Sequence, residues 1–398
     1  PDWLKPCWSR APGRQSTVRP SEPVRVHRAS MLLATWPAAL GGLLWSIGVL
    51  GRRLGIEGAP ARDRLVRSTC TALVYSCASA LVPVLGLATL DRSLLLEQAS
   101  DAQWLARVPV IAVCGLISGL GGLLGTMALA MSAGSDSALM SIAENSIYAV
   151  SSAVLVAVFF GERPGAMQYV SAATLLLGLV SAHSAAHDTG MAPELYMQLE
   201  KRDPGLEADR DCTATDATTD LPSVDDLADA ESLDSCKQTP PQPSGGRALE
   251  MAILAGLCWG FGPVGKKYGV AAAPEHLRQA WTVTTCLVYM VCTLLVPLGR
   301  LLITDSASRT KVFNDKPFHF LLAGTAVCGI VGGLGSLVST LALALAPGSS
   351  ALISVVENGV ETVGAALLIM CVFREVPTKR QLGGAAVVFL GVLLASAS

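Results

Sequence analysis

Long apolar runs with almost no Asp, Glu, Lys or Arg constrain the fold of this chain more than any other feature. A helix that crosses a bilayer core of about 30 Å needs about 20 such residues. Ten runs follow one another along the chain: 31–51, 68–90, 108–135, 137–161, 164–187, 251–265, 279–299, 320–346, 348–373 and 381–398. Only 15% of the 398 residues are charged, against about 25% in soluble domains. We therefore predict an all-α polytopic membrane protein with ten transmembrane helices.

Two polar segments divide the chain into units. Residues 1–30 carry six Lys/Arg and two acidic residues, and we predict a disordered basic tail, with the remnant of a transit peptide as the alternative. Residues 188–247 hold fourteen acidic and five basic residues. That composition cannot bury a core, so we predict a disordered acidic linker. The remaining residues form two five-helix units, 31–187 and 248–398.

Several classes of protein are disfavoured by the composition. The net charge of −2 leaves no basic face for nucleic acid. Most of the eleven cysteines lie in apolar runs and no CxxC occurs, so we interpret them as packing residues. His183 and His187 are one helical turn apart, which is a weak metal signal because two ligands do not make a site. The motifs HExxH and GxSxG are absent, and we expect neither an enzyme nor a cofactor.

A stretch with a carboxylate inside an apolar run occurs twice. Residues 137–150 read SALMSIAENSIYAV and residues 350–363 read SALISVVENGVETV. Glu144 and Asn145 of the first copy correspond to Glu357 and Asn358 of the second. Because a carboxylate in the middle of a span is costly to keep in lipid, such a residue is a functional hypothesis by default.

The repeat extends over both units. Trp45 is matched by Trp259, and Arg52 and Arg53 by Lys266 and Lys267, each 214 positions later. An odd number of spans per copy places the second copy upside down relative to the first, an arrangement found in secondary transporters with a substrate site near the midplane. For helices that begin near Ser135 and Gly348, each glutamate lies nine residues in, about 14 Å along the helix. We therefore expect both glutamates to reach the midplane from opposite sides.

The two units resemble a known family. The early segments GLLWSIG and GLCWGFG, the late segments FFGERP and VFREVP, and the closing segments QYVSAATLLLGLV and QLGGAAVVFLGVL are similar to the EamA-type unit of the drug/metabolite transporter superfamily. The resemblance implies ten helices in two inverted repeats around a central cavity, with transport by alternating access. Family members carry diverse small solutes. Arg374 departs from the pattern, because it replaces the glycine of FFGE in the second copy.

The candidate pathway residues surround the repeated Glu-Asn pairs. Glu144 and Glu357 are interpreted as cavity residues that load and release a proton, and a paired carboxyl that holds two helices together is the alternative. Glu361 lies one turn from Glu357, where like charges repel, so one of the two is expected to be neutral or paired with a cation. Its counterpart in the first copy is Tyr148, which makes the expected cavity asymmetric. Asn145 and Asn358 are suited to orienting polar groups of a substrate.

The remaining candidates are cations and aromatic residues. We favour membrane anchors that snorkel to the interface for the four basic residues at positions 52, 53, 266 and 267. Lys266 is the best candidate among them for contact with an anionic substrate. Trp45 and Trp259 are candidates for the cavity wall, with ordinary packing as the alternative.

Together these features predict a secondary active transporter of a small polar metabolite, coupled to protons through the midplane glutamates. The alternatives are a divalent cation transporter, in which the three glutamates hold the ion, and a membrane assembly protein that does not transport. The expected partners are a small-molecule substrate and the lipid bilayer, with a homodimer left open. The Lys/Arg counts on the two sides balance, so the positive-inside rule selects neither an orientation nor a membrane.

Overall fold

The computed structural model of the chain describes residues 23–60, 62–132, 137–162, 245–346 and 349–374, with isolated residues between 166 and 178 and between 379 and 391. Every regular element that it describes is helical. The long elements are α1 (Pro23–Leu54), α2 (Arg64–Ala88), α5 (Val108–Met131), α6 (Ser137–Phe160), α9 (Gly245–Trp259), α10 (Phe261–Val270), α11 (Arg278–Ile303), α13 (Lys316–Leu345) and α14 (Ser350–Phe373). The short helices between them are α3 (Arg92–Ser100), α4 (Ala102–Leu105), α12 (Ser306–Phe313) and η5 (Glu275–Leu277).

Seven helical stretches within the described residues are long and apolar enough to cross a membrane. They correspond to α2, α4 with α5, α6, α9 with α10, η5 with α11, α13 and α14. Helix α1 covers the expected run 31–51 and starts at Pro23, inside the segment expected to be a tail. The tail before Pro23 and the acidic segment from residue 188 to 244 lie outside the described residues, and only isolated residues of the expected runs 164–187 and 381–398 are described. The all-helical membrane class is confirmed, whereas the count of ten spans is not.

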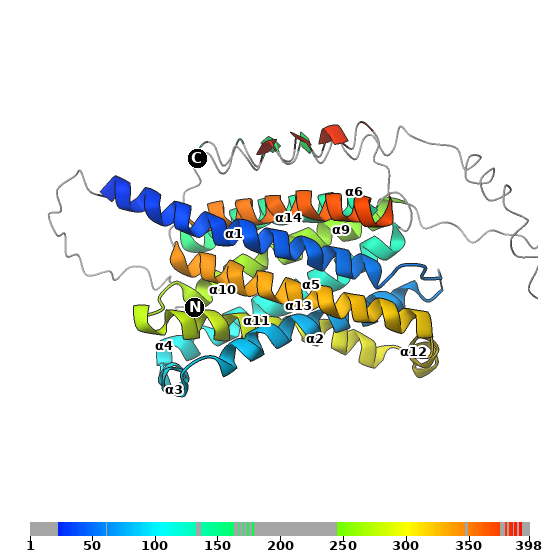
Figure 1. The fold of residues 1–398 in the computed structure, drawn as a ribbon, viewed down its shortest axis with the longest axis horizontal. Coiled ribbons are helices and arrows are strands. Elements are labelled where there is room, and N and C mark those ends of the chain that lie inside the picture. Colours follow the sequence, from blue (N-terminus) through cyan, green and yellow to red (C-terminus); the bar gives the residue numbers. More distant parts are fainter. Residues whose placement is uncertain are drawn as a thin grey trace, which may run out of the picture.

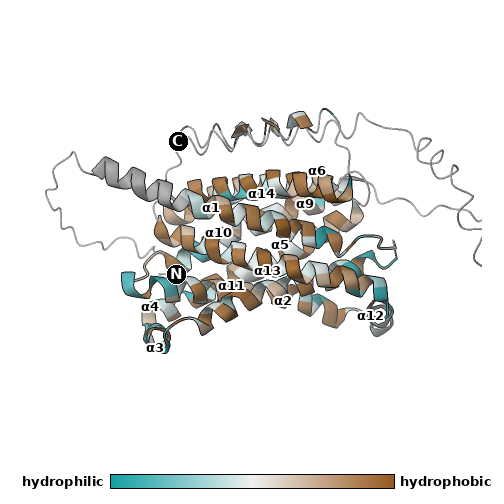
Figure 2. Cartoon of the chain, viewed as in Figure 1, coloured by the Kyte–Doolittle hydropathy of each residue, from teal (hydrophilic) through white to brown (hydrophobic). Residues whose placement is uncertain are grey.

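The helices form one elongated bundle whose long members lie side by side (Figure 1). Apolar residues cover the length of these helices, and hydrophilic residues gather on the short helices at the ends (Figure 2). Large apolar side chains point outward, among them Phe320, Val158 and Leu85 at 81%, 72% and 66% exposure. An apolar outer surface of this extent is stable against lipid rather than water. The chain is therefore an integral multi-pass membrane protein.

The two halves of the chain interleave instead of packing as separate bodies. Helix α1 of the first half packs against α13 and α14 of the second half, while α9 of the second half packs against α5 and α6 of the first. Helix α2 contacts α13, α11 contacts α5, and α6 lies against α14. The hydrophobic interior is consequently shared by both halves, and any cavity at its centre is lined by both.

Equivalent contacts occur twice with the halves exchanged. The Ser79 hydroxyl donates to the carbonyl of Gly329 at 2.8 Å, and the Thr293 hydroxyl, 214 positions after Ser79, donates to the carbonyl of Gly115 at 3.2 Å. Glycines permit these close approaches. A Cβ atom at Gly119 would lie 2.4 Å from the carbonyl oxygen of Thr293. Glycines therefore bring helices together between α5 and α11 and between α13 and α2.

Matching caps mark opposite ends of the bundle. The Asp91 side chain accepts a hydrogen bond from the backbone N–H of Ser93 at the start of α3, and Asp305 accepts one from Ser308 at the start of α12. These hydrogen bonds stabilise the charged carboxylates and lower the pKa of both aspartates. Although Asp91 and Asp305 are 214 positions apart in the sequence, α3 and α12 lie at opposite ends of the bundle (Figure 1).

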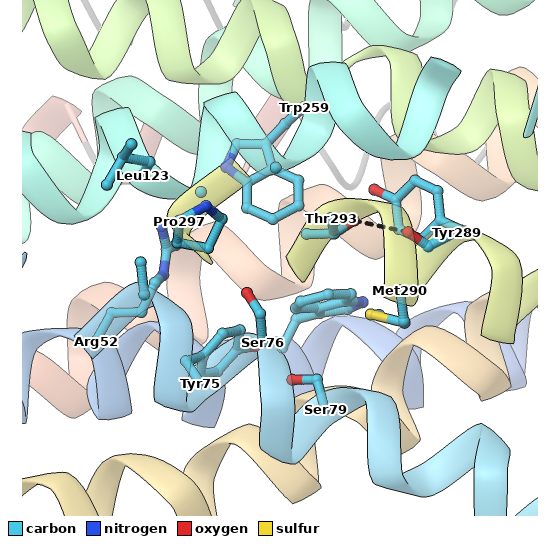
Figure 3. A pocket seen from close by; sticks show the side chains of 14 residues that line it. Arg52, Tyr75, Ser76, Ser79, Leu123, Trp259, Tyr289, Met290, Thr293 and Pro297 are labelled. Carbon is cyan, nitrogen blue, oxygen red and sulfur yellow. Dashed lines mark hydrogen bonds between the residues drawn. The ribbon is translucent and has the colours of Figure 1, made fainter. Parts of the chain in front are cut away.

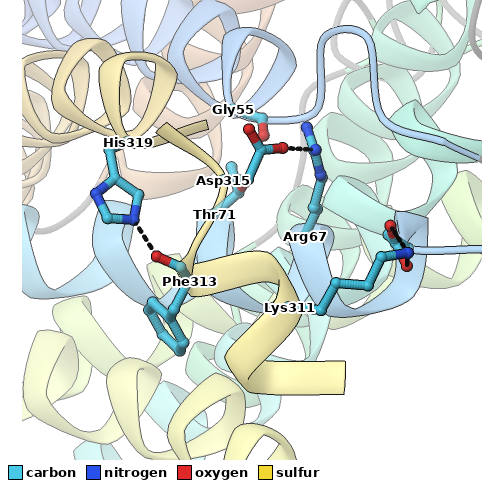
Figure 4. Close-up of polar contacts among 8 residues, drawn as sticks. Gly55, Arg67, Thr71, Lys311, Phe313, Asp315 and His319 are labelled. Atoms are coloured by element: carbon cyan, nitrogen blue, oxygen red, sulfur yellow. Dashed lines mark hydrogen bonds and ion pairs between the residues drawn. The ribbon is translucent and has the colours of Figure 1, made fainter. Parts of the chain in front are cut away.

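A polar cluster fastens α2 to α12 and α13 at one of these ends (Figure 4). Arg67 forms an ion pair with Asp315, and its guanidinium lies 4.9 Å from the ring centroid of Phe318. Lys311 forms an ion pair with Asp63 at 2.8 Å. These contacts join residues 248 positions apart in the sequence, so they bind the two halves to each other outside the apolar core.

The C-terminal end of α14 offers a test of local backbone strain. Arg374 has φ 54°, in the left-handed region, and the equivalent residue that ends α6 is Gly161 at φ 65°. Because glycine adopts this conformation without a Cβ clash, Arg374→Gly is expected to raise the free energy of unfolding by about 1 kcal/mol. The measurement is reversible unfolding in mixed detergent micelles.

The matched control for that substitution is Gly161→Ala, which introduces a Cβ at the equivalent position and is expected to lower stability. A stabilising effect of Gly161→Ala, or a destabilising effect of Arg374→Gly, would contradict the assignment of strain to Arg374.

Candidate functional site

Two adjoining cavities lie at the centre of the bundle. We call the two together the central cavity. Both are lined by Trp45, Arg52, Tyr75, Trp259 and Tyr289. The larger compartment extends between α2, α5 and α11, and Figure 3 shows its polar and aromatic wall. The smaller one, here named the charged compartment, is additionally lined by Asn145, Tyr148, Lys266 and Glu361.

Glu144 is held by two donors from different helices. Its Oε1 accepts a hydrogen bond from Arg52 Nη1 at 3.0 Å and another from Trp259 Nε1 at 2.9 Å. Arg52 and Glu144 are 4% and 1% exposed. Gly125 makes room for the carboxylate, since a Cβ there would lie 2.5 Å from Oε1. The site thus contains a buried ion pair whose charges are satisfied within the protein.

Glu357 has a different environment, although it occupies the equivalent position. Its Oε2 accepts a hydrogen bond from the Ser339 hydroxyl at 2.7 Å, and its Oε1 has no hydrogen-bond partner among the described residues. Ser339 is the counterpart of Gly125, 214 positions later. The two copies therefore satisfy their glutamates differently, one with an arginine and an indole and the other with a hydroxyl.

Glu361 and Lys266 bring charges of opposite sign to the wall of the charged compartment. Glu361 is 5% exposed and Lys266 is 2% exposed. The Lys266 ammonium lies 5.4 Å from the Trp45 ring centroid and 5.2 Å from that of Tyr289. Within the described part of the chain, neither side chain forms an ion pair or a hydrogen bond with another residue.

The two asparagines differ in their access to the cavity. Asn145 lines the charged compartment, and its Nδ2 has no hydrogen-bond partner in the described ranges. Asn358 instead packs toward α6, where its Nδ2 donates to the Ser152 hydroxyl at 3.2 Å. Asn145 is consequently placed to contact a solute, whereas Asn358 links α14 to α6.

Aromatic rings close the cavity where the halves meet. Trp45 and Trp259 form an edge-to-face pair with ring centroids 6.1 Å apart. Tyr148 lies 6.4 Å from Trp259, and the Arg52 guanidinium is 5.9 Å from the same indole. Trp45 and Trp259 thus line the central cavity and also pack against each other.

The prediction that the four basic residues snorkel to the membrane interface is wrong. Arg52, Arg53, Lys266 and Lys267 are only 2–5% exposed. Arg53 donates to the Ser137 hydroxyl at 2.9 Å. Lys267 forms an ion pair with Glu162, whose other oxygen accepts from the backbone N–H of Ala351 at 3.2 Å. Because internal partners compensate the charges of Arg52, Arg53 and Lys267, these side chains do not need to reach water.

Arg52, Tyr75 and Tyr289 line the cavity but were not selected as site residues from the sequence. Arg52 was assigned to the interface because it follows an apolar run. Tyr75 and Tyr289 occupy equivalent positions of the two copies, 214 residues apart. A polar residue that occurs within a span in both copies is a signal that could have identified them. Tyrosine hydroxyls are buried here between close glycines, with Tyr75 Oη 2.3 Å from a Cβ built at Gly48.

The residues described include no cluster of three or more His, Cys, Asp or Glu side chains that could hold a metal ion. Glu144, Glu357 and Glu361 are all described, and they do not form such a cluster. His183 and His187 lie outside the described residues.

Comparisons with known proteins agree with this architecture. The profile of the EamA-like transporter family matches residues 247–397. No curated protein sequence matches the chain. Fifteen chains of solved structures are similar to it. One of them, described only as the crystal structure of a protein, has a TM-score of 0.50 at 17% identity over 91% of this chain and 96% of that chain.

At 17% identity the structural likeness shows the fold alone, and it extends over both halves. The family match is confined to the second half, where it includes Lys266, Glu357 and Glu361. The chain is thus an integral multi-pass membrane protein whose second half is similar to the EamA-like transporter family.

Proposed function

We propose that the protein is a secondary active transporter that moves a small polar metabolite by alternating access. The observation that carries the proposal is the central cavity, because both halves contribute buried charged side chains to its wall. Buried charges in a membrane protein are costly and mark solute or ion pathways. A purely structural bundle has no need of a buried lysine and a buried glutamate, Lys266 and Glu361, that form no ion pair with the described residues.

The arrangement of the halves supports an inverted repeat of ten spans. Equivalent capped helices, α3 and α12, lie at opposite ends of the bundle (Figure 1). Equivalent hydrogen bonds are formed with the halves exchanged. In this arrangement a movement of the interleaved helices exposes the central cavity first to one side of the membrane and then to the other.

Proton coupling is assigned to the glutamates. Glu144 forms an ion pair with Arg52. Opening of this pair removes the charge that compensates the Glu144 carboxylate and favours its protonation. Glu357 and Glu361 are one turn apart on α14 and influence each other electrostatically. A proton taken up by one of these carboxyls relieves this repulsion, and its release on the other side returns the transporter to the starting state.

The test is solute flux in proteoliposomes, with and without a proton gradient. Glu144→Gln and Glu357→Gln are each expected to lower proton-driven flux at least tenfold, about 1.4 kcal/mol in activation free energy, while the folded protein is retained. Glu97→Gln is the control, since Glu97 is exposed on α3 and paired only with His276. Normal flux in both single variants would contradict the mechanism.

A further inference from the structure

The charged compartment contains two opposite charges that the described part of the protein does not neutralise by direct contact. Arg52 and Glu144 form an ion pair at 3.0 Å, whereas Lys266 and Glu361 line the same compartment without any ion pair to the described residues. A buried charge without a hydrogen-bonded partner is strongly unfavourable. Both side chains are therefore suited to receive a ligand of complementary charge.

The surroundings of Lys266 leave its hydrogen-bonding capacity unused. The ammonium faces the rings of Trp45 and Tyr289 at 5.4 and 5.2 Å. Cation–π attraction to a ring does not supply lone pairs for the three N–H donors. Asn145 Nδ2 also lacks a partner within the described ranges and belongs to the same compartment. The Lys266 ammonium and the Asn145 amide are therefore both able to donate hydrogen bonds to a ligand carboxylate.

Glu361 brings a negative charge to the same compartment, and this charge needs a positively charged partner. The charges that influence it most are those of Glu357, Arg52, Glu144 and Lys266, and no side chain in the described residues donates a hydrogen bond to its carboxylate. Its counterpart in the first copy is Tyr148, which lines the same compartment. The carboxylate is therefore an addition of the second copy, and an ammonium group of a ligand would satisfy it.

The charge balance distinguishes three classes of ligand. A simple anion would satisfy Lys266 and leave Glu361 unpaired, and a simple cation would do the reverse. A zwitterion satisfies both and adds no net charge to a low-dielectric site. Building on the function proposed above, we propose that the charged compartment binds a small zwitterion, with its carboxylate at Lys266 and Asn145 and its ammonium at Glu361. The aromatic side chains of the wall contact the hydrocarbon part.

The test compares ligands that differ only in charge. The thermal unfolding temperature of the purified protein in detergent is measured with L-leucine, 4-methylpentanoate and 3-methylbutylamine, and again with 6-aminohexanoate, hexanoate and hexylamine. Ligands that bind the native state raise this temperature by mass action. At least one zwitterion is expected to raise it, and its two singly charged analogues are expected to bind about tenfold or more weakly.

Variants then assign each charge to a residue. Lys266→Met is expected to weaken binding of the zwitterion about tenfold or more. It is also expected to improve binding of the amine relative to the wild type, because the ammonium of the ligand is no longer repelled by Lys266. Glu361→Gln is expected to weaken the zwitterion and to improve the carboxylate. Glu97→Gln, outside the cavity, should leave every affinity unchanged. The comparison of ligands on the wild-type protein does not depend on the variants, so it tests the proposal even if a variant does not fold.

Three results would overturn the proposal. Equal binding of the carboxylate and the zwitterion would make the compartment an anion site, equal binding of the amine would make it a cation site, and no stabilisation by either zwitterion would remove the assignment. Uptake of the bound zwitterion into proteoliposomes is measured separately. Binding without uptake would contradict the transport proposal alone, and flux of other solutes without zwitterion binding would contradict this inference alone.

Discussion

Replacing Arg52 with methionine is expected to lower the free energy of unfolding by about 3 kcal/mol, as is typical when one partner of a buried ion pair is removed. The physical reason is that the substitution leaves the buried Glu144 carboxylate without its ion-pair partner. Glu144 is 1% exposed and accepts its hydrogen bonds from Arg52 and Trp259. Without Arg52, Glu144 either keeps an uncompensated charge in an apolar interior or takes up a proton. The measurement is reversible unfolding in mixed detergent micelles.

A double variant separates the pair from the packing of the arginine. Arg52→Met with Glu144→Gln removes both charges and is expected to recover most of the lost stability, since an apolar replacement of a buried pair is often neutral. Arg92→Met is the matched control, because Arg92 is exposed on α3 and its loss should change stability little. A double variant no more stable than the single one would show that the pair is not the source of the effect.

Gly333→Ala is expected to lower the free energy of unfolding by about 3 kcal/mol, because it overpacks a contact between helix backbones. A Cβ at Gly333 would lie 2.4 Å from the carbonyl oxygen of Ser79 and 2.8 Å from its Cα. Main-chain atoms cannot move aside as a flexible side chain can, so α13 and α2 must separate. This separation would also strain the hydrogen bond from Ser79 to the carbonyl of Gly329.

The same helix supplies the control for this substitution. Around Gly324 on α13 a Cβ would meet only the Leu54 side chain, at 3.9 Å. Gly324→Ala is therefore expected to be neutral or to stabilise the helix by up to about 1 kcal/mol. If Gly333→Ala were as well tolerated as Gly324→Ala, the close approach of α2 and α13 would be wrong.

The sequence predicted the membrane class from apolar runs, because the energetics of the bilayer demand length and composition rather than particular contacts. Eight of the ten runs lie on described helices, including α1, and only isolated residues of the remaining two are described. The repeat also led directly to Glu144, Glu357 and Glu361, since carboxylates within such runs are conspicuous. The site residues drawn from this pattern remain predictions until flux and binding are measured.

The sequence could not predict which charges meet. Arg52 and Glu144 are 92 positions apart, and Arg52 stands at the end of an apolar run where an interfacial anchor is ordinary. Its burial follows from the packing of α1 against the other half of the chain, which places it beside Glu144 and Trp259. The two copies differ at Gly125 and its counterpart Ser339, and at Tyr148 and its counterpart Glu361. Only the packed structure shows that these four residues lie beside the glutamates or in the wall of the charged compartment.

The sequence by itself therefore determined the membrane class, the duplication and the presence of carboxylates within the spans, because each depends on local composition and spacing. Only the tertiary structure decided that Glu144 is paired while Lys266 and Glu361 face a shared compartment without a direct partner among the described residues. The reason is physical. The free energy of a buried charge depends on the groups within a few ångströms of it, and here these groups come from helices far apart in the sequence.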